Sequence, residues 1–496
     1  MKRILLALLI FVSVSYYPDA QGADSKSAPF VFRLHLSGEP NQMDPNRQKT
    51  SASSYLLANL FRNIYIYDNE KGLVSDLGSC SRDKSQNLVC KLKKDLQWSD
   101  GSLLTSADFL RTYKKMLNPK VTAPRADLLF KVKNAEDIYK GLKQPDTLGI
   151  TTPDPLTVRF EFQGKAPDFE YNLASFLLAP TKEDIKVYSG PYKIKEWLQG
   201  QKIVLEPNLK YQGGHPQRPQ VEFLFIEEDT VALQLYEKNQ LQLLRRLPTL
   251  FIPKSKTRED FHWIPVVRFD YLGFGPELRN NEDLRKALTY SLNYSELQKL
   301  FSAKGRPGCA GLPDSWFPEK APCFDFDLKK VPKVKTDKTY TLMFSSLGGE
   351  DHKRATEWMQ SQWSKNAGLK LHLEMKENKV YLSELQTNPP AIFRKGVATD
   401  RPTCLAALEI FASHSPENYI QLKNSEYDQI LTQLGNATKA SEQKKLCHIG
   451  VKFLMDRHLI IPMGAFDFAM LIKPDFVGWK INQMNQLDLS QLHSRP

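Results

Sequence analysis

One strand–helix–strand pattern restricts most strongly how this chain can fold. "YTLMF" (340–344) and "LKLHLEM" (369–375) have the composition of strands, and "KRATEWMQSQWSKNAG" (353–368) has the apolar spacing of a helix. A strand, a helix and a strand in this order form a βαβ unit. The unit predicts an α/β fold, with "FRKGVATD" (393–400) as the next strand of the same sheet.

The strand over 393–400 carries an unusual arrangement of charge. Because side chains alternate between the two faces of a strand, Arg394, Gly396, Ala398 and Asp400 share one face. The two charges are roughly 20 Å apart along the strand at about 3.3 Å per residue. A cation, a trough of small residues and an anion would match a zwitterionic ligand. The alternative is an ordinary strand whose charged ends reach solvent.

The length of the chain and its first residues set further limits. A chain of 496 residues is too long for one core, so two or three domains are expected. Residues 1–22 combine basic residues, an apolar stretch over 4–14 and small residues at cleavage spacing, which predicts a secretory signal peptide. No later apolar run is long enough to span a membrane. The first cysteine is Cys80, so we expect a soluble exported protein and not a lipoprotein.

The six cysteines are expected to form disulfides. An even count in an oxidising compartment favours bonded cysteines, and neither CxxC nor a zinc-binding spacing occurs. Their order along the chain suggests three local pairs, although the sequence alone permits 15 connectivities. The suggested pairs are Cys80–Cys90, Cys309–Cys323 and Cys404–Cys447.

Charge and motifs narrow the functional classes. The net charge of +12 is spread along the chain, which indicates a soluble protein and not a nucleic-acid surface. The motifs GxSxG, HExxH, GxGxxG and the P-loop do not occur, so we expect no cofactor, no metal and no enzyme activity. An exported hydrolase without a recognisable motif remains the rival to a binding protein.

Local sequence signals also predict helices, strands and turns in other parts of the chain. Thr105 and Asp108 form a capping box at the start of a helix over 105–119, and Asn281 caps a helix over 280–301. Cys80 and Cys90 flank the polar tip of a predicted hairpin. Two further strands over 189–211 meet at a turn at Gln199-Gly200, and a domain break is expected near 268–272.

Six stretches carry a family resemblance in order along the chain. They are "GEPNQMDP" (38–45), "LQWSDGSLLTSADFLRTYKKMLNP" (96–119), "SGPYKIKEW" and "IVLEPNLKY" (within 189–211), "NNEDLRKALTYSLNYSEL" (280–297) and "RKGVATD" (394–400). Together they resemble the peptide/nickel class (family 5) of extracytoplasmic solute-binding proteins that feed ABC transporters, and in particular its oligopeptide-binding members.

The resemblance implies an α/β, bilobed periplasmic-binding-protein-like fold of the class II type, with three domains, mixed sheets and a hinge between the lobes. Domain I would comprise 23–60, 185–268 and 470–496, domain II 61–184 and domain III 269–469. The implied function is a monomeric periplasmic receptor that captures a peptide and delivers it to an ABC permease in the inner membrane, without a nucleic-acid partner.

The resemblance also implies a ligand site. In peptide-binding relatives the strand aspartate holds the α-amino group and the arginine six residues earlier lies toward the carboxylate, which corresponds here to Asp400 and Arg394. Gly396 and Ala398 would line the site between them. The family's Trp and Cys on this strand are replaced by Val397 and Ala398.

Other positions make the expected site more basic. Lys49 stands where relatives can carry an acidic residue, and Arg125 stands where they often place a tyrosine facing the ligand. Thr50 and Ser51 complete the expected ligand-binding set. A peptide is the first expectation, and an anionic, sugar or chelate ligand is the alternative.

Overall fold

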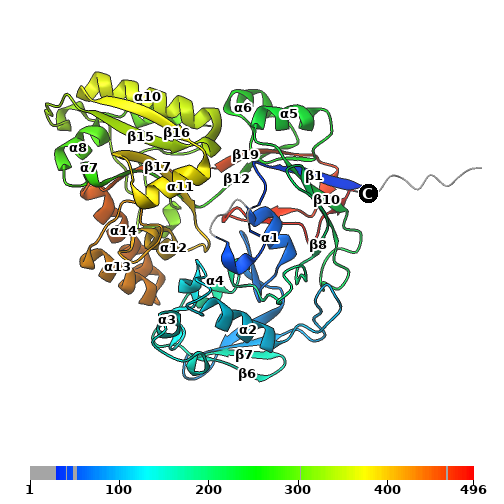
Figure 1. Ribbon diagram of the computed structural model, residues 1–496. Helices are drawn as coiled ribbons and strands as arrows, with labels where there is room; N and C mark the ends of the chain where they lie inside the picture. Colours follow the sequence, from blue (N-terminus) through cyan, green and yellow to red (C-terminus); the bar gives the residue numbers. More distant parts are fainter. Residues whose placement is uncertain (1–29, 41, 49–52, 302, 465–466, 496) are drawn as a thin grey trace, which may run out of the picture.

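The computed structural model describes residues 30–40, 42–48, 53–301, 303–464 and 467–495. The expected signal peptide and three expected site residues, Lys49, Thr50 and Ser51, lie outside these ranges. Three sheets, of eight, five and four strands, organise the described chain (Figure 1). Within the same ranges, no helix combines the length and the apolar character needed to cross a membrane.

The largest sheet joins strands from distant parts of the chain. Its order is β12-β19-β11-β1-β10-β9-β8, with β14 paired to β19. β1 is parallel to β10 and to β11, so these three strands end at the same edge. β8 and β9 form the expected antiparallel pair around Gly200. The bounds are β1 Val31–Leu36, β8 Tyr192–Leu198, β9 Lys202–Pro207, β10 Gln220–Phe225, β11 Leu243–Leu244, β12 Phe261–Ile264, β14 Ala303–Lys304 and β19 Asp467–Ile472.

The five-stranded sheet contains the predicted βαβ unit. Its order is β16-β15-β17-β13-β18, and β15 is parallel to both β16 and β17. Helix α10 connects β15 to β16 and ends at Gly368, which adopts the left-handed conformation that favours glycine. The bounds are β13 Arg268–Phe274, β15 Thr339–Ser345, β16 Lys370–Lys376, β17 Ile392–Ala398, β18 Ile460–Gly464 and α10 Gly349–Ala367. The predicted strand is therefore shorter than expected, and Asp400 lies beyond its end.

Helices cover both faces of this sheet. Phe269 and Phe393 pack on one face with residues of α12, α13 and α14, and Leu272 and Ile392 pack on the other with α8 and α10. This mixed sheet requires such cover because both of its faces carry apolar side chains. The other helices of this region are α7 Pro276–Arg279, α8 Glu282–Tyr290, α9 Tyr294–Gln298, α11 Asn378–Thr387, α12 Cys404–Leu408, α13 Ser425–Asn436 and α14 Ala440–Asp456.

The four-stranded sheet is antiparallel and small. Its order is β4-β5-β7-β6, and α2 packs against β6 and β7. The predicted capping box of Thr105 and Asp108 begins α2. The bounds are β4 Gly78–Arg82, β5 Leu88–Leu92, β6 Ile150–Asp154, β7 Thr157–Phe160, α2 Ser106–Met116, α3 Ala135–Tyr139 and α4 Phe169–Asn172.

Short elements complete the described chain. α1 packs beside β8 and β22, and α5 lies next to β11. Three two-stranded pairs, β2–β3, β20–β23 and β21–β22, lie outside the large sheets. The bounds are α1 Ser54–Leu60, α5 Asp229–Glu237, α6 Ile252–Ser255, β2 Tyr65–Asp68, β3 Gly72–Ser75, β20 Phe476–Val477, β21 Lys480–Ile481, β22 Leu487–Asp488 and β23 His493–Ser494.

All three disulfides suggested by sequence order are present. One joins neighbouring positions of β4 and β5, and another ties α12 to α14. The third closes a loop between two residues that also form a β-bridge. The pairs are Cys80–Cys90, Cys404–Cys447 and Cys309–Cys323.

Two short passages join a strand of the eight-stranded sheet directly to a strand of the five-stranded sheet, while longer connections on either side of β14 also cross between these sheets. The first passage runs from Ile264 at the end of β12 to Arg268 at the start of β13. The second runs from Gly464 at the end of β18 to Asp467 at the start of β19. The change of sheet thus falls just before the expected break at 268–272.

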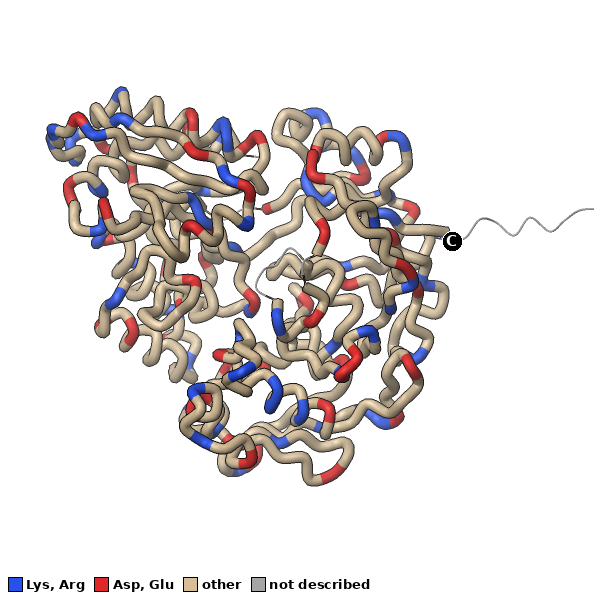
Figure 2. Tube along the Cα trace, viewed as in Figure 1, with Lys and Arg blue, Asp and Glu red and all other residues tan. Residues whose placement is uncertain are grey.

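Charged residues of both signs are interspersed over the whole molecule. Figure 2 shows lysine and arginine alternating with aspartate and glutamate around all three sheets. No single-sign patch dominates this view, so the positive net charge is distributed and not concentrated on one surface.

Candidate functional site

Two sheets direct the carboxyl ends of their parallel strands toward a common region. Arg246, which follows β11 closely, donates a hydrogen bond of 3.1 Å to the carbonyl of Leu347, which follows β15. The Thr249 hydroxyl donates to the Asp351 carboxylate nearby. Ligands of open α/β sheets bind outside the carboxyl ends of the strands. This meeting of two carboxyl edges is therefore the candidate site.

The small residues of β17 make room for an ion pair within the sheet. Asp270 on β13 lies directly opposite Gly396, and Arg268 lies opposite Ala398. A Cβ at Gly396 would lie 1.8 Å from Asp270 Oδ1 and 2.1 Å from Arg268 Nη2. Residues directly opposite on antiparallel strands share a face, so the Arg268–Asp270 pair (3.1 Å) occupies the expected trough.

Arg394 is buried on the same face. Its Nη1 lies 2.6 Å and 2.7 Å from the two ring nitrogens of His352, and its Nη2 lies 3.8 Å from Asp270. Burial lowers the pKa of His352 well below its ordinary value, and the charge of Arg394 lowers it further. A neutral imidazole accepts a hydrogen bond from the guanidinium. Arg394 is therefore held by His352 and Asp270, which belong to the same five-stranded sheet and its helices.

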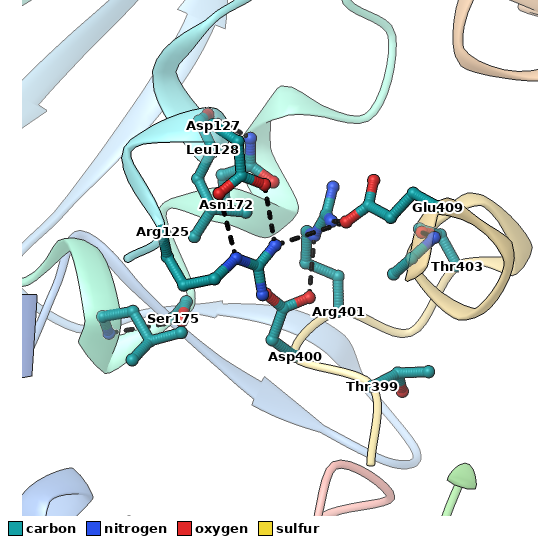
Figure 3. Close-up of polar contacts among 12 residues, drawn as sticks. Arg125, Asp127, Leu128, Asn172, Ser175, Thr399, Asp400, Arg401, Thr403 and Glu409 are labelled. Atoms are coloured by element: carbon teal, nitrogen blue, oxygen red, sulfur yellow. Dashed lines mark hydrogen bonds and ion pairs between the residues drawn. The ribbon is translucent and has the colours of Figure 1, made fainter. Parts of the chain in front are cut away.

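Asp400 lies in a partly buried cluster of charges (Figure 3). Its Oδ1 accepts a hydrogen bond of 3.0 Å from Nε of Arg401, and its Oδ2 accepts one from Nη1 of Arg125. Burial would raise the pKa of Asp400, but Arg125 and Arg401 outweigh it and lower the pKa to about 2. Both oxygens of the expected amine-binding carboxylate therefore have a partner from the chain itself.

Arg125 joins the region of the four-stranded sheet to the helices beside the five-stranded sheet. It precedes the 3-10 helix Ala126–Leu129 and donates two hydrogen bonds of 3.0 Å to Asp127. Its Nη2 also lies 3.3 Å from Glu409, which Arg401 contacts as well (Figure 3). Three carboxylates share two guanidiniums here. Burial raises the pKa of Glu409 to about 7, although both arginines oppose the shift.

Two weaker polar contacts extend the same boundary. The Lys131 ammonium lies 3.3 Å from the side-chain oxygen of Asn436 at the end of α13. The Gln443 amide donates a hydrogen bond of 3.3 Å to Asp168. These contacts are polar and few, which is typical of surfaces that separate and close again.

Sequence reasoning missed several charged residues of the site. Asp270 stands two residues after Arg268 in the otherwise apolar strand "RFDYLGF", and this pair of charges was the available signal. Arg245, Arg401 and Glu409 carry no local signal, because their importance comes from neighbours distant in sequence. Lys395 points to the opposite face of β17 from Arg394, where its ammonium lies 5.3 Å from the ring centroid of Tyr419.

Comparison with known proteins identifies the family. The family described as bacterial extracellular solute-binding proteins, family 5 Middle, matches residues 79–419, which is more than half of the chain. The chain belongs to this family. The resemblance seen in the ordered sequence blocks is thereby confirmed.

Relatives match this family member over nearly their whole length. The periplasmic murein peptide-binding protein MppA of Escherichia coli is 23% identical, over 98% of this chain and 97% of the relative. The probable deoxycholate-binding periplasmic protein YgiS of Escherichia coli is 24% identical, over 97% of this chain and 96% of the relative. Both are named as periplasmic proteins.

A solved structure of the family agrees with the fold. OppA of Haemophilus influenzae in complex with RPPGFSPFR has a TM-score of 0.83 at 21% identity, covering 94% of this chain and 98% of that chain. This likeness confirms the predicted α/β, bilobed periplasmic-binding fold.

Proposed function

We propose that this protein is a non-catalytic periplasmic receptor that captures a peptide between two lobes and delivers it to an ABC permease. The observation that carries the proposal is the meeting of the carboxyl edges of two sheets across a charged region. The names of the relatives and the peptide in the OppA complex support a peptide as the ligand. The cleavable signal peptide over 1–22 and a monomeric state belong to the same proposal.

In this proposal, the eight-stranded and four-stranded sheets belong to one lobe and the five-stranded sheet belongs to the other. One lobe contains domain I (23–60, 185–268 and 470–496) and domain II (61–184), and the other is domain III (269–469). Binding is coupled to closure, which shifts the population toward the form in which the lobes touch. The contacts of Arg125 with Asp400 and Glu409 would then form on closure, because they join domain II to domain III.

We assign the ligand contacts as follows. A peptide amine competes with Arg125 for Asp400, and main-chain hydrogen bonds along the edge of β17 near Gly396 and Ala398 hold the peptide. Arg394 contributes positive charge from within the sheet, and Thr50 and Ser51 complete the site. The Arg268–Asp270 pair over Gly396 narrows the space on that face of β17.

A non-peptide acid is the second candidate ligand. Asp400 already has two guanidinium partners in the chain, so the site does not need an ammonium group to neutralise it. The relative named as a probable deoxycholate-binding protein supports a ligand of this kind.

Native mass spectrometry of the protein purified under non-denaturing conditions tests the function. We expect one peptide per chain to co-purify, and we expect the same peptide, once identified and synthesised, to bind again with one-to-one stoichiometry in calorimetry. A co-purified species without peptide bonds would support the second candidate. The absence of any retained peptide, from the cell or from a tripeptide library, would overturn the first.

A further inference from the structure

Arg245 occupies the carboxyl edge of the eight-stranded sheet. It directly follows β11, and its guanidinium lies 5.1 Å from the ring centroid of Tyr55 on α1. Tyr55 is fully buried, and its hydroxyl donates a hydrogen bond of 2.9 Å to Asn485. The ring is therefore fixed in position, and it holds the guanidinium at the edge where the two sheets meet.

The guanidinium of Arg245 has no hydrogen-bonding or ionic partner within the described part of the chain. Every other arginine there that is at least partly buried contacts a carboxylate, a carbonyl or another polar side chain. The adjacent Arg246 shows the contrast, because it pairs with Asp229 and with the carbonyl of Leu347. Asp229 is the nearby carboxylate, and it is shared between Arg246 and His35, which lies 3.8 Å away.

The groups around Arg245 supply little negative charge to balance its guanidinium. Burial lowers its pKa, and the charge of Arg246 lowers it further, while Tyr55 and Asp229 act in the opposite direction. Burial also lowers the pKa of His35, and an imidazole supplies no negative charge in either protonation state. A cation that is largely removed from water without a counter-ion is unfavourable. A planar guanidinium is suited to bind a carboxylate through two parallel hydrogen bonds.

We propose that Arg245 is the anion-binding residue of the site and takes the carboxylate of its ligand through two parallel hydrogen bonds. Arg394 is less available for this role, since His352 and Asp270 already contact it. The proposal rests on the proposed ligand site between the lobes, and it requires an acid: either the terminal carboxylate of a peptide or the carboxylate of a non-peptide ligand.

The test uses matched probes that differ in one charge. The first pair is a tripeptide library with free carboxyl ends and the same library amidated at its carboxyl ends. The second pair is deoxycholate and its methyl ester. Retention is measured by native mass spectrometry, and affinity for the retained species by calorimetry. The variants are Arg245→Gln, which removes the charge, and Arg245→Lys, which keeps the charge without the planar fork.

Arg495→Gln is the control variant. It also removes one positive charge, from a side chain that is 60% exposed and lies 3.8 Å from the Glu259 carboxylate. Its affinity for every probe should equal that of the wild type.

We expect wild-type protein to retain a free acid and to bind the matched amide or ester at least tenfold more weakly. Arg245→Gln should bind the acid ten- to a hundredfold more weakly, since a charge-assisted hydrogen bond is lost. Arg245→Lys should fall between the two. The melting temperature of ligand-free Arg245→Gln should be unchanged or higher, because an uncompensated cation has been removed.

The outcomes separate this proposal from the proposed function. Equal binding of free and amidated peptides, or unchanged affinity in Arg245→Gln, would overturn the role of Arg245 and leave the peptide receptor intact. Retention of deoxycholate alone, lost in Arg245→Gln, would support Arg245 and overturn the peptide ligand. Retention of no acid by the wild type would overturn both. If Arg245→Gln does not fold, Arg245→Lys decides, because a loss of affinity for the acid and not for the amide supports Arg245, and unchanged affinity for the acid overturns its role.

Discussion

Arg125→Gln should open the ligand-free protein. Arg125 contacts three carboxylates, but Asp127 belongs to its own region and stays with it when the lobes separate. Of the ion pairs that Arg125 makes, opening therefore breaks the two with Asp400 and Glu409 and keeps the one with Asp127. Glutamine keeps most of the volume of the side chain and removes its charge, so the substitution tests these two ion pairs without creating a large cavity.

The structure sets the size of the effect. A hydrogen bond to a charged group contributes about 1.5–3 kcal/mol, but on opening both partners regain water, so we assign about 2–3 kcal/mol to the two ion pairs together. This energy corresponds to a shift of roughly 30- to 150-fold in the ratio of closed to open protein. Added salt should weaken the wild-type ion pairs, since their side chains are 13–26% exposed.

Small-angle scattering of ligand-free protein at pH 7 measures the shift as an increase in the radius of gyration. Arg82→Gln is the matched control, because Arg82 pairs with Glu170 within one region and is 23% exposed, against 21% for Arg125. A wild type that is already as extended as Arg125→Gln would refute the reasoning, because the ion pairs would then not hold the lobes together. An equal expansion in the Arg82 control would refute it as well.

Three further predictions concern Glu409, the Cys80–Cys90 disulfide and Gly396. Burial raises the pKa of Glu409 from 4.5 to about 7, so the closed form loses up to about 3 kcal/mol of stability as Glu409 ionises between about pH 4.5 and 7. The radius of gyration measured by scattering should therefore be larger at pH 8 than at pH 5. Glu409→Gln should abolish this difference. Replacing both Cys80 and Cys90 by serine should lower the unfolding free energy by about 2–3 kcal/mol in urea denaturation, and peptide mapping of non-reduced wild type should find the two linked. Gly396→Ala should cost about 1–3 kcal/mol in the same denaturation assay, because its methyl group would collide with Asp270; an unchanged midpoint would show that the Arg268–Asp270 pair moves aside freely.

Local signals in the sequence predicted local structure well. The capping box of Thr105 and Asp108 begins α2, and Asn281 caps α8 through its side chain. The strand–helix–strand pattern became β15, α10 and β16 because each step depends on neighbours a few residues away. The disulfides also followed sequence order, since two of the three close loops of 10 and 14 residues.

The interactions of the site could not be predicted in the same way. The alternation along "FRKGVATD" correctly places Arg394 and Gly396 on one face, but it does not reveal the Arg268–Asp270 pair of the adjacent strand, more than a hundred residues earlier. Asp400 receives a hydrogen bond from Arg125, 275 residues before it. A charge pattern over eight residues contains no information on such distant partners. From the sequence alone, a charge that is paired within the fold therefore cannot be distinguished from one that binds a ligand.

The two short passages between the eight-stranded and five-stranded sheets restrict how the proposed lobes can move. They are paired on both sides, because Asp270 lies opposite Gly464 in one sheet and Ile264 lies opposite Phe468 in the other. A paired ribbon bends readily perpendicular to its plane, whereas shear or twist would break the register of its strands. In the proposed closure, bending of these passages is therefore favoured over shear of one lobe past the other. A ligand that closes the lobes has little orientational entropy to remove, so more of its contact energy remains as affinity.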